Sequence, residues 1–388
     1  MSCTGCGACA VACSLGCVAM EPNDEGFLYP TVDGARCVDC SKCVESCVAD
    51  GSDDLRTPQK ALLARARASE ARRSSSGGIA YVLARMVLDE GGAVVACALD
   101  ENGVARHRAF DRADDLWRMQ GSKYVQSDAT AGYELCCERL RQGRRVLYIG
   151  MPCQVAAAKR LVGGDSRLLT VDVVCHGVPS PGFWQKDLSF QNDWGRLLNR
   201  QTVMFRSSGR RSRSAFELYD DAGGRAVPYE LDAFFTLFMR GASFRESCYS
   251  CSFARRERAG DLTIGDCASR DRYPGFHPAE SLSIVLTNTP AGSEALDALL
   301  AEGLIDAMPI DMVTEAKANG QLHAPSQRPP IRDQVYEDLA TLPYGEFFRR
   351  YRMKPSLGWW AKRALKRLLP VGARVKIRHA VRRVRLRG

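Results

Sequence analysis

Two stretches near the start of the chain decide the first part of the fold: CTGCGACAVAC at residues 3–13 and CVDCSKCVESC at residues 37–47. Each carries four cysteines in the spacing C-x2-C-x2-C-x3-C. A double run of this kind is the ligand pattern of two [4Fe–4S] clusters, in which the fourth cysteine of each run ligates the other cluster. The spacing predicts a small α+β, ferredoxin-like module through which electrons move.

The crossed ligation pattern assigns each of the eight cysteines to one cluster. We expect one cluster on Cys3, Cys6, Cys9 and Cys47, and the other on Cys37, Cys40, Cys43 and Cys13. Zinc and disulfides are the alternatives, but zinc sites usually show two cysteine pairs separated by a longer loop. Ser14 and Val48 replace the proline that often follows the fourth cysteine, which affects turn geometry rather than ligation.

The chain is long enough for two or three domains, with 388 residues of which 45% are hydrophobic. We expect the two-cluster module at residues 1–57, an α/β body at 58–345 that divides at about 143/144, and a tail at 346–388. No apolar run reaches the roughly 18 residues of a membrane span, and the start lacks a signal-peptide pattern. We therefore expect a reducing cytoplasm, where the 17 cysteines are metal ligands and free thiols.

The tail is strongly basic. Residues 349–388 contain fifteen Lys or Arg and no Asp or Glu, and therefore contribute a charge of +15. Because the whole chain has a net charge of +9, the first 348 residues carry a net charge of −6. Apolar residues recur there at helical spacing, beginning at Trp359 and Trp360, with an interruption at Pro370 and Gly372. Such a helix can lie on an anionic membrane at the inner face, although it can also pack on the body or stay disordered. Specific nucleic-acid binding is not expected.

The body begins with a possible phosphate site. Ser74-Ser75-Ser76-Gly77-Gly78 precedes the apolar helical pattern of 79–88, and backbone amides at such a helix start attract phosphate. The same residues can simply cap the helix. A strand at 93–99 and helices at 111–118 and 129–141 follow.

A βαβ unit comes next, with strands at 145–149 and 168–174 around a helix at 155–161. Ligands bind at the carboxyl ends of such strands, so Cys153 and Cys175 should emerge on that edge of the sheet. With Cys248 and Cys251 they make four thiols, the number that a third [4Fe–4S] cluster needs. Isolated cysteines are also often small buried residues, and C-x2-C can be redox-active or bind zinc.

With these motifs in collinear order, the chain resembles the beta subunit of coenzyme F420 hydrogenase/dehydrogenase, an iron–sulfur flavoprotein family. The matching strings are SSSGG at 74–78, GSKYVQS at 121–127, MPCQ at 151–154, VDVVCHGVPSP at 171–181, CYSC at 248–251 and DLTIGD at 261–266. The likeness covers residues 1 to about 290. It implies an α/β domain at 58–345 that binds FAD and places the third cluster, on the four body cysteines, near the flavin.

The resemblance also implies residue roles. It favours flavin phosphate contacts from the serine-rich helix start and flavin proximity for the 121–124 loop; the residues concerned are Ser75, Ser76, Gly77, Gly78, Gly121, Ser122, Lys123 and Tyr124. Lys123 can alternatively be a surface lysine. His176, beside Cys175, is a candidate proton donor, although a structural histidine is the simpler interpretation.

Two segments depart from the family pattern, after Phe205-Arg206 and after Gly265-Asp266, where an electron acceptor would dock. Coenzyme F420 is therefore in doubt as the substrate. The expected function is an oxidoreductase that passes electrons between ferredoxin or another redox partner, the clusters, FAD and an organic two-electron acceptor. The alternatives are a non-enzymatic electron-transfer subunit that serves a partner enzyme, and a cluster-bearing scaffold without flavin.

Overall fold

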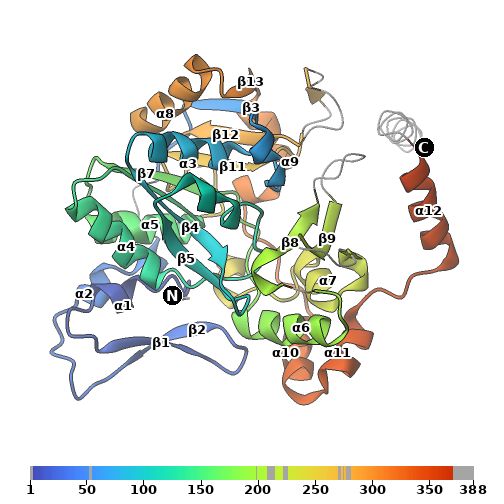
Figure 1. The fold of residues 1–388 in the computed structure, drawn as a ribbon. Coiled ribbons are helices and arrows are strands. Elements are labelled where there is room, and N and C mark those ends of the chain that lie inside the picture. Colours follow the sequence, from blue (N-terminus) through green and yellow to red (C-terminus); the bar gives the residue numbers. More distant parts are fainter. Residues whose placement is uncertain are drawn as a thin grey trace.

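The protein is described by a computed structural model that covers residues 3–51, 55–197, 199–207, 215–221, 226–269, 272–273, 275–276 and 281–369. Its centre is an eight-stranded mixed sheet with the strand order β13-β3-β12-β11-β7-β6-β4-β5 (Figure 1). The strands are β3 (Lys60–Ala66), β4 (Ala93–Leu99), β5 (Ala105–Phe110), β6 (Val146–Gly150), β7 (Leu168–Val173), β11 (Leu262–Asp266), β12 (Ser283–Thr287) and β13 (Ile305–Pro309).

Parallel pairing is confined to the middle of this sheet. β4 pairs with β6, β6 with β7, and β7 with β11 in parallel, whereas the other neighbours are antiparallel. Parallel strands need crossover connections: α4 (Thr130–Arg141) lies between β4 and β6 in the sequence, and α5 (Pro152–Val162) between β6 and β7, whereas α3 (Ile79–Asp89) precedes β4. The carboxyl ends of β4, β6, β7 and β11 therefore meet at one edge.

Helices cover both faces of the sheet because its central strands are apolar on both sides. Val94 and Leu147 pack with α3 and α8 (Pro290–Ala301), whereas their neighbours Val95 and Tyr148 pack with α4 and α5. Such a two-sided apolar pattern is typical of strands buried between helical layers.

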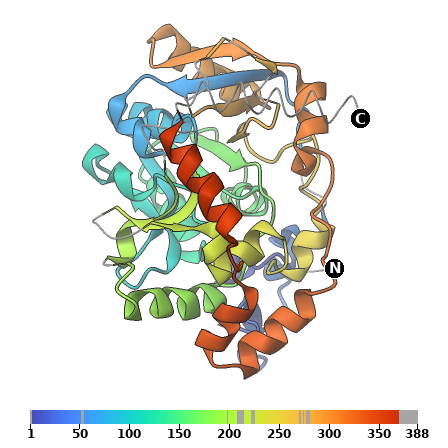
Figure 2. The same cartoon turned by 90° about the vertical axis from the view of Figure 1, so that its right-hand side faces the viewer.

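A second layer carries an aromatic core. It combines the sheet β10-β9-β8 with four helices, and Figure 2 shows the helices gathered below the main sheet. The elements are α6 (Pro181–Asp193), β8 (Val203–Ser207), β9 (Ala215–Asp220), β10 (Val227–Pro228), α7 (Ala233–Met239), α10 (Arg332–Thr341) and α11 (Tyr344–Tyr351). The chain also forms α9 (Met312–Ala318) and ends its described part with α12 (Leu357–Leu368).

The N-terminal residues are attached to both layers. They form α1 (Ala8–Ala12), the hairpin β1 (Val18–Pro22) and β2 (Leu28–Val32), and α2 (Lys42–Glu45). Cys6 and Ala8 pack with α4 and α5, whereas Phe27 belongs to the aromatic core. Arg332 binds both carboxylate oxygens of Glu25 at 2.6 and 2.7 Å, so the hairpin is held against α10.

The mixed α/β fold of the body is confirmed, and one local prediction needs correction. The helix predicted at 155–161 starts at Pro152, because proline suits the first helical turn and Gln154 Oε1 accepts from the Met151 amide. The segment predicted to be helical at 111–118 forms a 3₁₀ helix over 113–118. The two-cluster character of the N-terminal part and the domain boundaries stay predictions.

Within the described residues, no helix is both long enough and apolar enough to cross a bilayer. The predicted interruption at Pro370 and Gly372 lies outside the described part of the chain.

Two buried carboxylates face each other in the helical layer. Tyr344 OH donates to Asp187 Oδ1 at 2.6 Å, and Gln191 Nε2 donates to Asp232 Oδ2 at 2.5 Å. Burial and then the neighbouring Asp232 raise the pKa of Asp187 well above its usual range, and burial raises the pKa of Asp232 to about 6. At a pH just above the ordinary Asp pKa of about 4, the folded pair therefore still holds a proton, whereas both carboxyls of the unfolded chain are ionised.

This pair should make stability fall as the pH rises above about 4, through the Asp232 pKa of about 6 and onward to the raised pKa of Asp187, because raised carboxyl pKa values favour the folded state only while the proton is retained. Asp187→Asn should flatten that slope, since the amide still accepts from Tyr344 and can donate to Asp232. Urea unfolding at several pH values measures it, with Asp193→Asn on the exposed end of the same helix as control. Equal slopes for wild type and Asp187→Asn would contradict the assignment.

Candidate functional site

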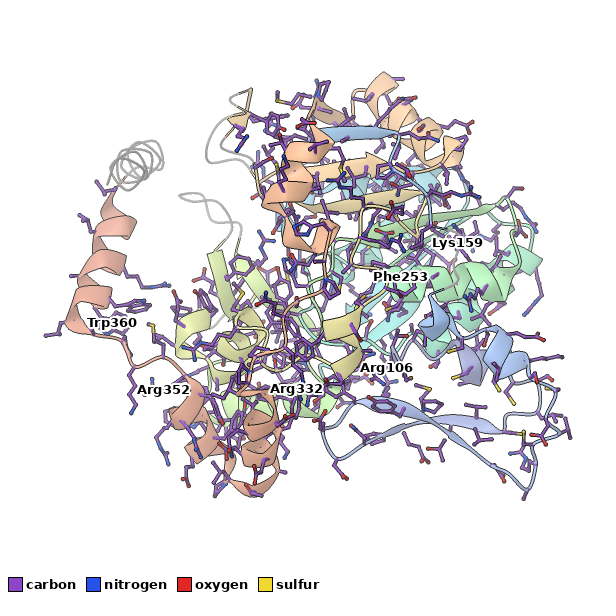
Figure 3. The ribbon with its side chains drawn as sticks, turned by 180° about the vertical axis from the view of Figure 1, so that it is seen from behind. Arg106, Lys159, Phe253, Arg332, Arg352 and Trp360 are labelled. Carbon is purple, nitrogen blue, oxygen red and sulfur yellow. The ribbon has the colours of Figure 1, made fainter. Side chains whose placement is uncertain are left out.

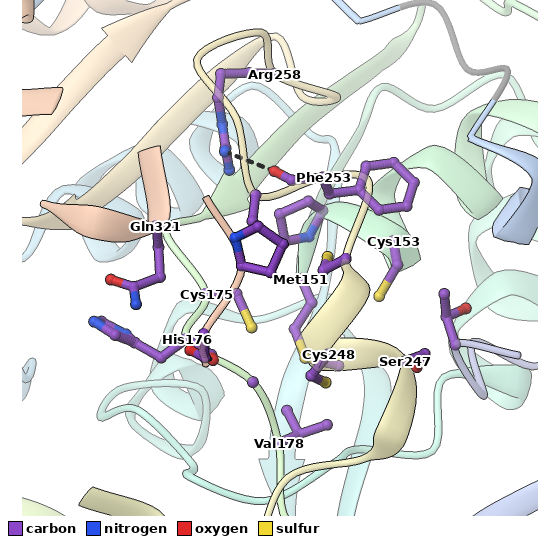
Figure 4. A pocket seen from close by; sticks show the side chains of 17 residues that line it. Met151, Cys153, Cys175, His176, Val178, Ser247, Cys248, Phe253, Arg258 and Gln321 are labelled. Carbon is purple, nitrogen blue, oxygen red and sulfur yellow. Dashed lines mark hydrogen bonds between the residues drawn. The ribbon is translucent and has the colours of Figure 1, made fainter. Parts of the chain in front are cut away.

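Four cysteines from separate parts of the body line one small cavity of about 50 Å³, here called the thiol cavity. They are Cys153, Cys175, Cys248 and Cys251. Cys153 lies in the first turn of α5, Cys175 follows β7, and the other two lie in and directly after the 3₁₀ helix Glu246–Ser250. In Figure 4 the side chains of Cys153, Cys175 and Cys248 point toward the middle of this cavity.

These thiols are strongly desolvated. The pKa of Cys175 is raised to about 11 and that of Cys248 to about 12. Burial is the main cause in both, and the neighbouring Cys251 also raises both pKa values. Burial, followed by the neighbouring Cys6 and Cys251, raises the pKa of Cys153 well above its usual value. Thiols in such surroundings stay protonated unless a cation replaces the proton, which is what a metal does when it binds.

A buried ion pair fixes the loop that carries Cys251. Arg258, 1% exposed, donates to Asp172 Oδ1 at 2.8 Å, and Asp172 is fully buried on β7. The amides of Ala259 and Gly260 donate to the other oxygen of Asp172 at 3.1 and 2.8 Å. Arg258 also donates to the carbonyl of Phe253, a bond drawn in Figure 4. The strand before Cys175 is thus tied to the loop after Cys251.

The first N-terminal run lies beside the thiol cavity. Burial raises the pKa of Cys6, and the neighbouring Cys3 and Cys47 raise it further. Burial also raises the pKa of Cys9, to about 12, with added contributions from Cys6, Cys3 and Cys47. The structure therefore brings together the four cysteines predicted to hold one cluster. Thr4 lines the thiol cavity.

A polar network that the sequence did not reveal holds this run against the body. Arg245 is fully buried and donates to the Cys3 carbonyl at 2.8 Å. Gln126 accepts from Arg245 and donates to the Thr4 carbonyl at 2.9 Å. Nothing in the sequence except the position of Gln126 inside one of the family strings pointed to these contacts.

The second run lines its own cavity of about 140 Å³, here called the outer cavity. Its cysteines are Cys13, Cys17, Cys37, Cys40 and Cys43. Four of them are the set predicted for the second cluster, including the crossed cysteine of the first run. Cys17 is an addition, to which the sequence assigned no role; its amide donates to the Cys13 sulfur at 3.2 Å.

The two runs share a backbone conformation. Gly5 and Gly7 adopt φ values of +66° and +83°, and their equivalents in the second run, Asp39 and Ser41, adopt +51° and +61°. Left-handed geometry costs a non-glycine residue roughly 1–2 kcal/mol and is retained mainly where function requires it. The repeat in spacing is therefore also a repeat in loop shape, as two equivalent cluster-binding loops require.

No three His, Cys, Asp or Glu side chains among the described residues already stand close enough to hold a metal ion. Every cysteine is a free thiol. The donor sets thus gather at common cavities without a preformed coordination shell, and their role as cluster ligands stays a prediction.

A third cavity, of about 290 Å³, opens at the carboxyl ends of β4, β6, β7 and β11 and is here called the large cavity. Its volume lies near the lower end of the roughly 300–1,000 Å³ typical of ligand sites. Seven of the eight residues predicted to contact flavin line it: Ser75, Ser76, Gly78, Gly121, Ser122, Lys123 and Tyr124. It shares Met151, Cys175, His176, Gly177 and Val178 with the thiol cavity.

Gly77 is not among the residues that line the large cavity. Its amide donates to Ser283 Oγ at 2.9 Å, and a Cβ at this position would lie 2.4 Å from the Ala64 carbonyl oxygen. Gly77 therefore allows the loop to pass close to β3 and β12, and its amide is already bonded. Ser76 Oγ likewise donates to the Leu282 carbonyl at 2.6 Å, so this hydroxyl is also already bonded within the protein.

The start of α3 remains the best anion site on the cavity wall. Gly78 is its N-cap, with φ of 79° and no side chain to satisfy the first amides, and both Ile79 and Ala80 line the cavity. The partial positive charge of a helix N-terminus favours anions. Ser75 Oγ accepts from the Ser122 amide at 2.7 Å, which joins this helix start to the 121–124 loop.

Lys123 supplies a cation to the same wall. It donates to the carbonyls of Arg118 and Gln120, each at 3.0 Å, which leaves its third N–H without an acceptor among the described residues. Burial lowers its pKa to about 8, with Cys97 opposing and Arg73 adding to the shift. Lys123 is therefore not a freely solvated surface lysine.

Two histidines line the large cavity. His176 lines the thiol cavity as well, and its ring is exposed, although desolvation by the surrounding protein lowers its pKa while Asp266 opposes the shift. The sequence did not single out His107: its Nε2 lies 3.1 Å from the Ile149 carbonyl, its Nδ1 is buried without a partner, and burial lowers its pKa to about 4. His107 is therefore neutral at physiological pH.

The residues that directly precede the two departures from the family pattern line the large cavity. Arg206 pairs with Asp266 at 2.6 Å, and both line the cavity. The Cys267 thiol donates a hydrogen bond to Glu315 Oε2 at 3.4 Å. The same carboxylate accepts from the Ala268 and Ser269 amides at 2.8 and 3.0 Å. The segment 208–214 lies outside the described residues.

Comparison with known proteins supports the resemblance drawn from the motifs. Residues 143–313 match the family model for the C terminus of the coenzyme F420 hydrogenase/dehydrogenase beta subunit. One F(420)H(2) dehydrogenase subunit of Methanosarcina mazei is 25% identical over 172 residues, which are 40% of this chain and 47% of that protein. This chain thus matches about half the length of that relative. The resemblance is confirmed; the N-terminal two-cluster module lies outside the matched model.

One solved structure, a xenon derivative of the F420-reducing [NiFe] hydrogenase complex from Methanosarcina barkeri, contains a similar chain. The two share 19% sequence identity and a TM-score of 0.48, over 77% of this chain and 92% of that one.

The ion pair between Asp172 and Arg258 generates a prediction about stability. Arg258→Met should cost about 3–5 kcal/mol of unfolding free energy, because it leaves a buried carboxylate without its partner. Arg255→Met is the matched control: Arg255 pairs with Glu257 at 2.8 Å, but both side chains are solvent-exposed, so about 1 kcal/mol or less is expected. Anaerobic urea unfolding measures both. Equal stabilities of the two variants would contradict the role given to Arg258.

Proposed function

We propose that this protein is an iron–sulfur flavoprotein oxidoreductase that passes electrons between ferredoxin-type [4Fe–4S] clusters and FAD, and thereby reduces or oxidises an organic two-electron acceptor. The observation that carries the proposal is the continuous order of three cysteine sets and one cofactor-sized cavity. When bound, the clusters would supply one-electron transfer and FAD would join it to two-electron chemistry.

The order of the sites supports this interpretation. Cys13 of the first run lines the outer cavity. Cys6 of the same run is close enough to Cys153 of the thiol cavity to raise the pKa of that thiol. The thiol cavity in turn shares Cys175 and His176 with the large cavity. A path from the outer cavity to the large one therefore crosses each cysteine set once.

The chemistry of the large cavity fits FAD. Its wall offers the open amides at the start of α3 and the Lys123 cation to a pyrophosphate, and Tyr124 brings an aromatic ring to the same wall. We infer that Ser75, Ser76 and Ser122 shape this wall, with Gly78 and Gly121 allowing close approach of the backbone. Gly77 contributes through packing only.

The acceptor would enter where Arg206 and Asp266 line the cavity. Arg206 is almost fully buried and also lies over the ring of Phe216, at 4.8 Å from its centroid, so its position is fixed. His176 can hold a proton close to both cavities.

A redox partner protein would deliver or remove electrons at the outer cavity. Four exposed apolar side chains line it, among them Val38 at 66% and Val44 at 70% exposure; the others are Leu15 and Val32. Exposed apolar groups that cluster in this way are typical of protein contact sites. The partner can be a ferredoxin or a component of a larger complex.

One experiment separates an enzyme from an electron-transfer subunit that needs a partner's active site. The protein is reduced with dithionite, freed of reductant, and mixed anaerobically with a soluble quinone or nicotinamide. Reoxidation of its flavin absorbance by the diffusible acceptor alone supports the enzyme. Reoxidation only after a partner protein is added supports the electron-transfer subunit, and no flavin on denaturation would overturn both interpretations that include FAD.

The cluster assignment predicts iron content. Reconstituted wild-type protein should hold about twelve irons, and replacing Cys37, Cys40 and Cys43 by Ala should leave about eight, because one [4Fe–4S] cluster is lost. Cys175→Ala with Cys248→Ala should have the same effect through the thiol cavity. Cys137→Ala, a cysteine outside all three sets, is the control and should keep full iron. Zinc in place of iron, or unchanged iron in the triple variant, would contradict the assignment.

The cation at the large cavity predicts pH-dependent flavin binding. The Lys123 charge is present below its pKa of about 8 and is lost above it, so FAD should bind the flavin-free protein more weakly at pH 9 than at pH 7. Lys123→Met should bind weakly at both pH values. Lys186→Met is the matched control, since Lys186 also donates to a backbone carbonyl, at 2.9 Å, but does not line the cavity. Flavin fluorescence titration measures all three proteins, and equal affinities would refute the role of Lys123.

A further inference from the structure

Helix α12 contacts the body through its polar side. Arg363 Nη2 lies 3.5 Å from Glu217 Oε2 on β9, and its guanidinium lies over the Trp359 ring at 5.4 Å from the centroid. Both side chains are partly buried, and residues four apart share one face of a helix. The Trp359 and Arg363 face is therefore the one turned to the protein.

The apolar side of α12 is left in solvent. Leu357 is 88% exposed, Trp360 45% and Leu365 55%, and Ala361 and Ala364 between them are also exposed. At 100° per residue these five positions fall on one arc, centred roughly opposite the face that meets the protein. Figures 1 and 3 show the helix standing beside the body rather than packed into it.

This arrangement is the reverse of that expected in a globular domain. A surface helix normally turns its apolar stripe to the core and its charged residues to water. Ser356 Oγ accepts from the Trp359 amide at 3.2 Å, so the helix has a proper N-cap and does not depend on the body for its start. An exposed apolar arc on a capped helix needs an apolar environment other than this core.

The charge pattern indicates which environment that is. The sequence places Lys362, Lys366 and Arg367 at the helix positions outside the apolar arc, and the whole segment 349–388 contains fifteen cations and no acid. A helix that combines an apolar face containing Trp and Leu with several cations and no acid on its other positions is the pattern of helices that lie in an anionic membrane surface. A protein-binding helix has no comparable need to exclude every acidic residue.

We propose that α12 docks this protein on an anionic membrane surface. The Leu357, Trp360 and Leu365 face enters the headgroup region, and the flanking cations bind lipid phosphates. The helix lies in the surface plane and does not cross the bilayer. The proposal does not rest on the redox function, and it brings the same acidic body to the membrane whatever its substrate.

Co-sedimentation of the full-length protein with vesicles tests the proposal. We expect binding to phosphatidylcholine vesicles that contain one quarter phosphatidylglycerol, weak binding to pure phosphatidylcholine, and a decrease between about 0.1 M and 1 M salt, because salt screens the charges. Leu357→Ser combined with Leu365→Ser should weaken partitioning by at least about tenfold, since two leucine side chains no longer leave water.

A matched pair of substitutions controls for general loss of surface apolarity. Leu300→Ser combined with Val313→Ser removes side chains of 39% and 47% exposure on α8 and α9, and should bind like the wild type. Equal binding by the α12 double variant would overturn the proposal. So would a wild-type dimer that the α12 double variant converts to monomer without vesicles, which would mean that a second copy covers the helix. Displacement from vesicles by an equal charge of duplex DNA would show nonspecific polyanion binding instead.

Discussion

The buried ion pair between Asp172 and Arg258 is the constraint on which the centre of this protein depends. A carboxylate without solvent must be fully paired, and Asp172 obtains its partners from one guanidinium and two backbone amides of a single loop. Because Asp172 sits three residues before Cys175 and Arg258 seven after Cys251, electrostatic necessity brings together cysteines that are far apart in the sequence. The thiol cavity follows from that pairing.

The N-terminal module is held against this centre by side-chain contacts and not only by the chain that connects them. Arg245 reaches the carbonyl of Cys3, and Arg332 reaches the carboxylate of Glu25, so two buried arginines of the body bind the module at separate points. These contacts hold the module in a fixed position against the body. The valines that line the outer cavity remain exposed.

The large cavity and α12 show two opposite uses of desolvation. At the cavity, burial lowers the pKa of Lys123 and keeps His107 neutral, which prepares polar groups to meet a ligand in a site largely removed from water. At α12, apolar side chains remain in water because the polar face of the helix is used for the contact with β9. Each feature leaves side chains in an environment that the rest of the described protein does not make favourable.

The sequence by itself determined the local features: the two cysteine runs, the strands predicted at 93–99 and 168–174, the serine-rich helix start and the basic tail. Spacing and periodicity depend on neighbours along the chain, so they could be read directly. Only the tertiary structure decided that Gly77 has no free amide, that Cys17 and His107 border cavities, and that α12 turns its apolar face outward. These depend on contacts such as Arg258 with Asp172, 86 residues apart, whose pairing is set by burial and not by any local pattern.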